Sequence, residues 1–154
     1  MNAIPVMLVD DDQMLLRALS ETITLRMSTV TVETVTSTQE ALQLLQEREY
    51  SAIISDIQMP GMDGLELLSH VQKHYPDIPV LLITGYNDQK IAIEAVRAGA
   101  YDYIRKPIER DDFIAALTRA LSTYRLRQQV REQQQTLELY ALSIRYLMEH
   151  RAHE

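Results

Sequence analysis

The sequence predicts an α/β fold, a doubly wound parallel sheet with helices on both faces. Short apolar runs alternate with amphipathic stretches through residues 4–120. Several runs are apolar throughout, which is typical of strands that are buried on both faces. Five predicted strands and five predicted helices follow one another in strict alternation, and this order favours a parallel sheet with crossover helices.

The five predicted strands are short runs rich in Val, Ile and Leu, and β-branched residues favour strands. The third run leads directly into Asp56, and the fourth ends at Thr84-Gly85. The fifth is ended by Lys106-Pro107, because proline cannot continue the ladder of hydrogen bonds. In chain order, the predicted strands are Ile4–Val9, Val30–Val35, Ala52–Ser55, Val80–Ile83 and Tyr101–Ile104.

The five predicted helices are bounded by capping and breaking residues. Ser37-Thr38 can cap the second helix, Asn87 or Asp88 can cap the fourth, and Gly99 stops the fourth. A loop over residues 59–64, indicated by its proline and glycines, precedes the third. The predicted helices are Gln13–Arg26, Gln39–Arg48, Leu65–His74, Gln89–Arg97 and a final helix from Asp111 to about Glu149.

Composition excludes several classes of protein. No apolar run approaches the roughly 18–20 residues that a membrane span needs. The first residues lack the basic start and long apolar core of a signal peptide, so we expect a cytoplasmic protein. The chain has no cysteine, which excludes disulfides, zinc–thiolate sites and thiol nucleophiles. A net charge of −7 does not favour direct binding of nucleic acid.

The charge is unevenly distributed along the chain. Residues 1–118 hold nine Lys and Arg against eighteen Asp and Glu, whereas residues 119–154 hold six Arg against four Glu. The second stretch also has no glycine or proline. We therefore expect an acidic globular domain over residues 1–122 and a helical segment over residues 123–154.

Chemically active residue types stand at four predicted strand ends. Asp10-Asp11-Asp12 follow the first strand, Asp56 the third, Thr84 the fourth and Lys106 the fifth, and ligands of open α/β sheets bind at this edge. Clustered carboxylates repel one another unless a cation neutralises them, and an all-oxygen site suits Mg²⁺. One aspartate could then attack phosphorus, with the hydroxyl and the ammonium stabilising the phosphoryl oxygens. No glycine-rich nucleotide loop occurs.

The sequence resembles the receiver domain of bacterial two-component response regulators in four segments, MLVDDDQMLLRAL, IISDIQMPGMDGLELL, VLLITGY and AGAYDYIRKPI. These segments lie within residues 4–120, in the order and spacing typical of the family. The resemblance implies a flavodoxin-like sheet with strand order 2-1-3-4-5. It also implies a phosphorylation-activated switch that accepts a phosphoryl group from a sensor histidine kinase with Mg²⁺ and controls an output domain or partner.

The resemblance also assigns roles to residues of the acidic site. It implies that Asp56 is the phosphorylated nucleophile. Asp11 would coordinate Mg²⁺ directly and Asp10 through water, and Asp56 and the backbone carbonyl of Gln58 would complete the protein ligands. Gln58 and Tyr86 are expected to flank the path of the hydrolytic water, and the bulk of Tyr86 predicts an aspartyl-phosphate lifetime longer than seconds.

The resemblance further implies a conformational switch. Thr84 would bond a phosphoryl oxygen and move on activation, while Lys106 would pair with the phosphoryl group. Tyr103 matches the aromatic residue that turns inward as Thr84 moves. The family often has a cis peptide bond before the proline that matches Pro107.

The segment after the globular domain follows a heptad pattern that predicts a coiled-coil homodimer. A solitary helix that folds back on its own domain is the alternative. Because the chain has no room for an output domain, it is either a fragment cut inside a linker or a stand-alone regulator, and the uncapped ending favours a fragment. The predicted seam consists of Leu126, Val130, Leu137, Tyr140, Ile144 and Leu147, with Gln133 and Arg151 at the remaining seam positions.

Two other functions fit parts of the pattern. A Mg²⁺-dependent phosphatase with an aspartate nucleophile usually has a second carboxylate two residues on, where this chain has Gln58. A pure interaction module would not need the acidic pair, Asp56, Thr84 and Lys106 together. Each of these residues alone could be a cap or a solvated charge, but their convergence on one edge favours a phosphoacceptor that is not an enzyme.

Overall fold

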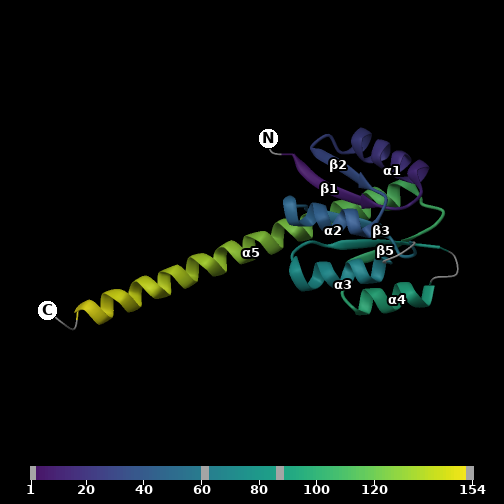
Figure 1. The fold of residues 1–154 in the computed structure, drawn as a ribbon. Coiled ribbons are helices and arrows are strands. Elements are labelled where there is room, and N and C mark those ends of the chain that lie inside the picture. Colours follow the sequence, from purple (N-terminus) through teal and green to yellow (C-terminus); the bar gives the residue numbers. More distant parts are fainter. Residues whose placement is uncertain (1–2, 60–62, 86–88, 152–154) are drawn as a thin grey trace. The chain divides into compact units, whose positions relative to one another are not determined.

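A computed structural model describes residues 3–59, 63–85 and 89–151 (Figure 1). Strands and helices alternate through the described residues, as the sequence predicts. The elements are β1 (Ile4–Val9), α1 (Gln13–Arg26), β2 (Val30–Val35), α2 (Thr38–Glu47), β3 (Ala52–Asp56), α3 (Gly64–His74), β4 (Val80–Thr84), α4 (Gln89–Arg97), β5 (Asp102–Arg105) and α5 (Arg110–Arg151).

The five strands form one parallel sheet in the order β2-β1-β3-β4-β5. This order confirms the predicted fold class. The register pairs Val9 with Ser55 and Asp56 with Ile83, so the carboxyl ends of β1, β3 and β4 lie side by side. Side chains that follow these strands are therefore brought to one edge of the sheet.

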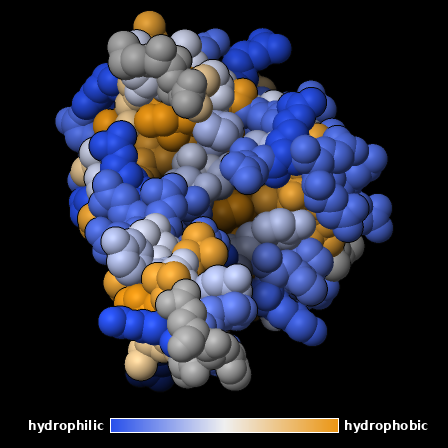
Figure 2. Space-filling model, turned by 90° about the vertical axis from the view of Figure 1, so that its left-hand side faces the viewer, coloured by the Kyte–Doolittle hydropathy of each residue, from blue (hydrophilic) through white to orange (hydrophobic). Residues whose placement is uncertain are grey.

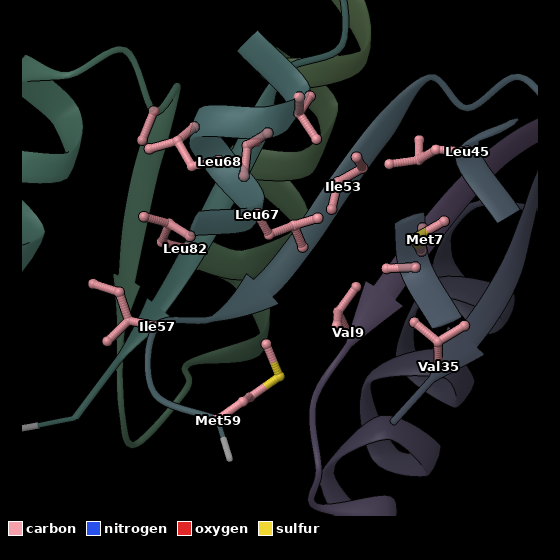
Figure 3. Packing of buried hydrophobic residues seen from close by; sticks show 14 of the residues in the cluster. Met7, Val9, Val35, Leu45, Ile53, Ile57, Met59, Leu67, Leu68 and Leu82 are labelled. Carbon is pink, nitrogen blue, oxygen red and sulfur yellow. The ribbon is translucent and has the colours of Figure 1, made fainter. Parts of the chain in front are cut away.

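Helices cover both faces of the sheet (Figure 1). On one face, side chains of α2, α3 and α4 pack on β1, β3 and β4 in a cluster that Figure 3 shows from close by, with Met59 pointing into it. On the other face, α1 and the first turns of α5 pack on the same sheet, with Ile23 and Phe113 fully buried. This double burial explains why the strands are apolar along their length.

Local signals set most of the helix boundaries. Asp12 caps α1 by accepting hydrogen bonds from the N–H groups of Met14 and Leu15, and Ser37 caps α2. Gly99 ends α4 with a φ of +114°, a conformation that favours glycine. The predicted α4 caps, Asn87 and Asp88, lie outside the described residues.

The predicted boundaries of the elements are within one residue of those observed, except at the carboxyl end of α5. Strand β5 begins and ends one residue later than predicted, and α3 begins at Gly64 rather than Leu65. The last helix is a single element, as expected, but it extends to Arg151.

The chain divides into two compact units, Met1–Tyr124 and Arg125–Glu154. The first contains the sheet and both clusters of buried side chains. The described part of the second is entirely helical, and its large apolar side chains are exposed. Figure 2 shows a mainly hydrophilic surface with separate hydrophobic patches. Among the described helices, none is both long and apolar enough to cross a membrane.

Candidate functional site

The edge of the sheet formed by the strand ends gathers three carboxylates. Asp10 and Asp11 follow β1, and Asp56 is the last residue of β3. One carboxylate oxygen from each of the three lies within 4.8 Å of the others. The backbone holds this edge together, since the Asp10 N–H donates to the carbonyl of Val35 at 3.1 Å. The structure therefore brings together the acidic residues that the sequence predicts to meet.

Asp10 is the most buried member of the cluster, with an exposed fraction of 1%. Its Oδ1 accepts a hydrogen bond from the Asp12 N–H at 2.9 Å, whereas its buried Oδ2 has no hydrogen-bond partner among the described residues. Burial, followed by the nearby Asp56 charge, raises the pKa of Asp10 from 3.8 to about 6, although the Asp12 N–H and Lys106 oppose the shift. An orphaned carboxylate oxygen between two further carboxylates fits a cation that binds through oxygen.

Asp56 is also buried, but two groups that contact its carboxylate lower the free-energy cost of burying this charge. Its Oδ1 accepts a hydrogen bond from the Gln58 N–H at 3.3 Å. Its Oδ2 lies 3.6 Å from Nζ of Lys106, the residue that follows β5. Asp56 therefore stands between the acidic pair and a partly exposed ammonium, where a group bound to its carboxylate would meet both.

Thr84 ends β4 and is fully buried. Its Oγ1 has no hydrogen-bond partner among the residues that the structure describes. A buried hydroxyl left unpaired costs about 1–3 kcal/mol. The Thr84 carbonyl accepts from the Lys106 N–H at 2.9 Å, so the backbone links the two predicted phosphoryl-binding residues directly.

Gly64 positions the backbone at Asp56, a role that sequence reasoning missed. The Gly64 N–H donates to the carbonyl of Ile57 at 3.0 Å, and a Cβ on Gly64 would lie 2.3 Å from the Asp56 carbonyl oxygen. On the other side, Oγ of Ser55 donates to the same carbonyl at 3.0 Å. The Asp63-Gly64 pair, a capping residue next to a glycine at a helix start, is the sequence signal that could have indicated this close approach.

The remaining predicted site residues lie around this edge. Tyr103 lies on β5, partly buried against the α2–α4 side of the core, and its N–H donates to the Asp102 carboxylate at 2.8 Å. The Lys106–Pro107 peptide bond is cis, as the resemblance implied. Gln58 is exposed next to Asp56, whereas Tyr86 lies outside the described residues.

Fold and site together define a small, doubly wound α/β domain with an oxygen-rich acidic site at the carboxyl edge of its sheet. The family model of the response regulator receiver domain matches residues 6–118. The chain belongs to this family, and its first unit is a receiver domain of the kind found in two-component response regulators.

Known proteins with similar sequences and structures agree with this family. The chain is 41% identical over 127 residues to the C4-dicarboxylate transport transcriptional regulatory protein DctD of Rhizobium meliloti, covering 82% of this chain and 27% of that protein. It is 36% identical over 129 residues to the DNA-binding transcriptional regulator NtrC of Escherichia coli K12, covering 84% and 27%. A response regulator receiver domain protein from Clostridium thermocellum superposes with a TM-score of 0.75 at 27% identity, over 80% of this chain and 98% of that one. The chain thus spans about a quarter of the length of these curated relatives.

Proposed function

We propose that this receiver domain is a switch that accepts a phosphoryl group on Asp56 from a phosphohistidine of a sensor histidine kinase. One observation carries the proposal: carboxylate oxygens of Asp10, Asp11 and Asp56 lie within 4.8 Å of one another, and Nζ of Lys106 lies 3.6 Å from Asp56. A cation held by these carboxylates, together with the Lys106 ammonium, can neutralise a phosphoryl group from two sides, while the Asp56 carboxylate remains the nucleophile.

The donor set of the acidic cluster fits Mg²⁺. Asp11, Asp56 and the backbone carbonyl of Gln58 would hold the ion directly, and Asp10 would hold it through water. All these donors are oxygens, and Oδ2 of Asp10 is buried without a hydrogen-bond partner among the described residues. When bound, the ion supplies positive charge to the carboxylates and to an oxygen of the transferred group.

Phosphoryl transfer then requires one bond to form and one to break. A carboxylate oxygen of Asp56 attacks phosphorus, the P–N bond to the kinase histidine breaks, and the imidazole leaves in neutral form after it takes up a proton. Lys106, which pairs with Asp56 in this structure, pairs with the phosphoryl group, and the Thr84 hydroxyl donates to a phosphoryl oxygen. Movement of Thr84 and inward rotation of Tyr103 then carry the change to the surface.

Accepting one phosphoryl group on its own side chain makes the domain a phosphoacceptor rather than a turnover enzyme. Gln58 stands two residues beyond Asp56 and has no carboxyl proton to give to a leaving group. The proposed activities are therefore self-phosphorylation and self-dephosphorylation, in the cytoplasm, where the kinase would present its phosphohistidine.

The mass of the intact chain after incubation with acetyl phosphate and Mg²⁺ tests phosphorylation. The wild type should gain about 80 Da, the mass of one added phosphoryl group, and Asp56→Asn should gain none. Asp63→Asn is the matched control, because it removes a nearby carboxylate that caps α3 and leaves the acidic cluster intact. A gain in Asp56→Asn, or no gain in the wild type, contradicts the assignment.

We further propose that residues 123–154 form a dimerisation segment that follows a receiver domain over residues 1–122. The predicted seam residues from Leu126 to Leu147 that the structure describes are exposed on a continuous helix, and a polar helix gains stability by pairing. The relatives are about four times longer than the aligned region, which supports control of an output domain or a downstream partner.

Light-scattering mass, measured with Mg²⁺ before and after addition of beryllofluoride, tests the seam. A dimer that needs beryllofluoride means that Asp56 controls pairing, and a dimer in both conditions means that the segment pairs constitutively. Val130→Glu places a charge in the seam and should abolish pairing through the seam, which lowers the mass of the assembly, whereas Gln135→Glu places the charge on another face and should leave the mass unchanged. A monomer throughout contradicts the seam and favours the folded-back helix.

A further inference from the structure

The last turns of α5 carry a second apolar stripe that the predicted seam does not use. Leu139, Leu142 and Tyr146 are spaced by three and four residues, so their side chains share one face of the helix. Their exposed fractions are 66%, 57% and 59%, and these side chains line a shallow groove together with the seam residue Leu147. We name these three residues the second stripe.

The second stripe lies opposite the predicted seam. An α-helix turns by about 100° per residue, so Tyr146, nine residues after the seam residue Leu137, points about 180° away from it. By the same rotation, Leu139 and Leu142 point within about 40° of Tyr146. A two-stranded coiled coil buries only its seam positions. A dimer through the seam therefore leaves the second stripe facing water.

The second stripe is also confined to one stretch of the helix. The positions that continue its face toward the amino terminus are polar, namely Gln128, Glu132 and Gln135. On the amino-terminal side of residue 139, the helical unit thus has one apolar face, the predicted seam. From residue 139 to residue 146 it has two apolar faces. Its partner must therefore cover about two helical turns.

The charges beside the second stripe make it complementary to itself in antiparallel orientation. Glu138 and Arg145 are seven residues apart and flank the stripe on the same side. A two-fold axis near Leu142 places Glu138 of each copy beside Arg145 of the other and sets Leu139 opposite Tyr146. In a parallel pair, Glu138 would instead face the other flank, where Ser143 offers no countercharge.

We propose that the second stripe binds the second stripe of another copy of this chain, with the two helices antiparallel. Charge complementarity selects this occupant, because two Glu–Arg pairs form around one apolar contact. Combined with the seam dimer of the proposed function, on which the stoichiometry rests, this contact joins seam dimers into larger assemblies, because each copy then binds one partner through each of two opposite faces. The contact itself uses the opposite face of the helix, so it can be tested separately from the seam.

The light-scattering mass of the full chain over a range of concentrations is the first test. The mass of the wild type should grow beyond that of the dimer as the concentration rises, and Leu142→Ser should stay a dimer at every concentration. Leu25→Ser is the matched control, because it makes the same change at a side chain of α1 that is 86% exposed, and its mass should grow as that of the wild type does. Growth beyond the dimer in Leu142→Ser, or a wild-type mass that Leu142→Ser does not lower, overturns the proposal.

The seam variant Val130→Glu separates the two contacts. It should form a dimer through the second stripe, and adding Leu142→Ser to it should give a monomer. If Val130→Glu alone is monomeric at concentrations where the wild type exceeds the dimer, the second-stripe contact is wrong and the seam stands. If the wild type is a dimer that only Leu142→Ser abolishes, the stripe stands and the seam is wrong.

A charge exchange tests the antiparallel orientation without removing an apolar side chain. Glu138→Arg and Arg145→Glu should each raise the dissociation constant of the second-stripe contact about tenfold, because each replaces two attractive pairs by repulsive ones. The double variant should return the constant to near the wild-type value. Single variants that weaken the contact without rescue in the double variant overturn the orientation.

Engineered cysteines give a direct reading of the same geometry, since the natural chain has none. The double variant Leu139→Cys/Tyr146→Cys should form a disulfide between copies on mild oxidation, because these positions face each other in an antiparallel pair. Each single variant should remain uncrosslinked. Crosslinking of a single variant indicates a parallel contact and contradicts the proposal.

Discussion

The receiver unit and the helical unit place their large apolar side chains in opposite environments. In the receiver unit, Phe113 is fully buried in the same helix that later exposes 69% of Leu137. The receiver unit buries two clusters of apolar side chains on the faces of its sheet. The large apolar side chains of the helical unit are exposed instead. One helix thus changes from a buried core element to an exposed element along its length.

Truncating one apolar side chain in each unit should therefore have very different effects. Phe113→Ala should lower the free energy of unfolding of the receiver by about 3–5 kcal/mol, because it removes a fully buried ring and leaves a cavity. Leu137→Ala should change it by less than about 0.5 kcal/mol. Urea unfolding of both variants at a dilution where the chain is monomeric measures the difference. A loss of more than about 1 kcal/mol in Leu137→Ala would show that the helix folds back on the receiver.

The receiver unit also contains a charge whose burial lowers stability, for which the helical unit has no counterpart among its described residues. Burial and the Asp56 charge raise the pKa of Asp10 to about 6 from its ordinary value of 3.8. Between these pH values the folded state keeps a proton that the unfolded state has lost. The free energy of unfolding should therefore fall as the pH rises through this window, by about 3 kcal/mol in total.

Asp10→Asn should abolish this loss, so that without Mg²⁺ the variant is more stable than the wild type at pH 7.5 and similar to it at pH 4. Urea unfolding in a chelator at both pH values measures the effect. Asp12→Asn is the control, because Asp12 is exposed and asparagine also caps helices. Equal pH dependence in the wild type and in Asp10→Asn would refute the explanation.

The same contrast shows what local sequence patterns can predict. Apolar runs and caps are local, so most element boundaries could be predicted from them, whereas the strand order is implied only by the resemblance to receiver domains. Parallel strands bring Asp10 and Asp56 to one edge. The close approach of Gly64 to the Asp56 carbonyl depends on how α3 packs; the Asp63-Gly64 pair indicates the helix start but not this distance. The Thr84 hydroxyl, which has no hydrogen-bond partner among the described residues, likewise depends on surroundings contributed by other strands.

In the helical unit, a local pattern predicts one face of the helix and misses another. The predicted seam follows from a heptad pattern, and Leu139, Leu142 and Tyr146 lie outside that pattern. These three side chains are recognised as a second apolar face only when their exposure is considered, because side chains outside a coiled-coil seam are ordinarily polar. Local patterns thus predict each helix face separately and do not state how many partners the faces need.

The smallest expected effect on stability concerns Thr84 of the receiver unit, whose hydroxyl is proposed to serve function but lowers the stability of the folded state. Thr84→Val keeps the shape of the side chain and removes a buried hydroxyl that has no hydrogen-bond partner among the described residues. The variant should be as stable as the wild type or up to about 1 kcal/mol more stable. Ser55→Ala is the contrasting control, because its hydroxyl donates to the Asp56 carbonyl and its loss should lower the free energy of unfolding. Thr84→Val should still gain a phosphoryl group, but any change of assembly that beryllofluoride causes in the wild type should be absent, since the hydroxyl proposed to bind the phosphoryl oxygen is gone. A variant that loses more than about 1 kcal/mol of stability would mean that the hydroxyl already has a partner in the folded state.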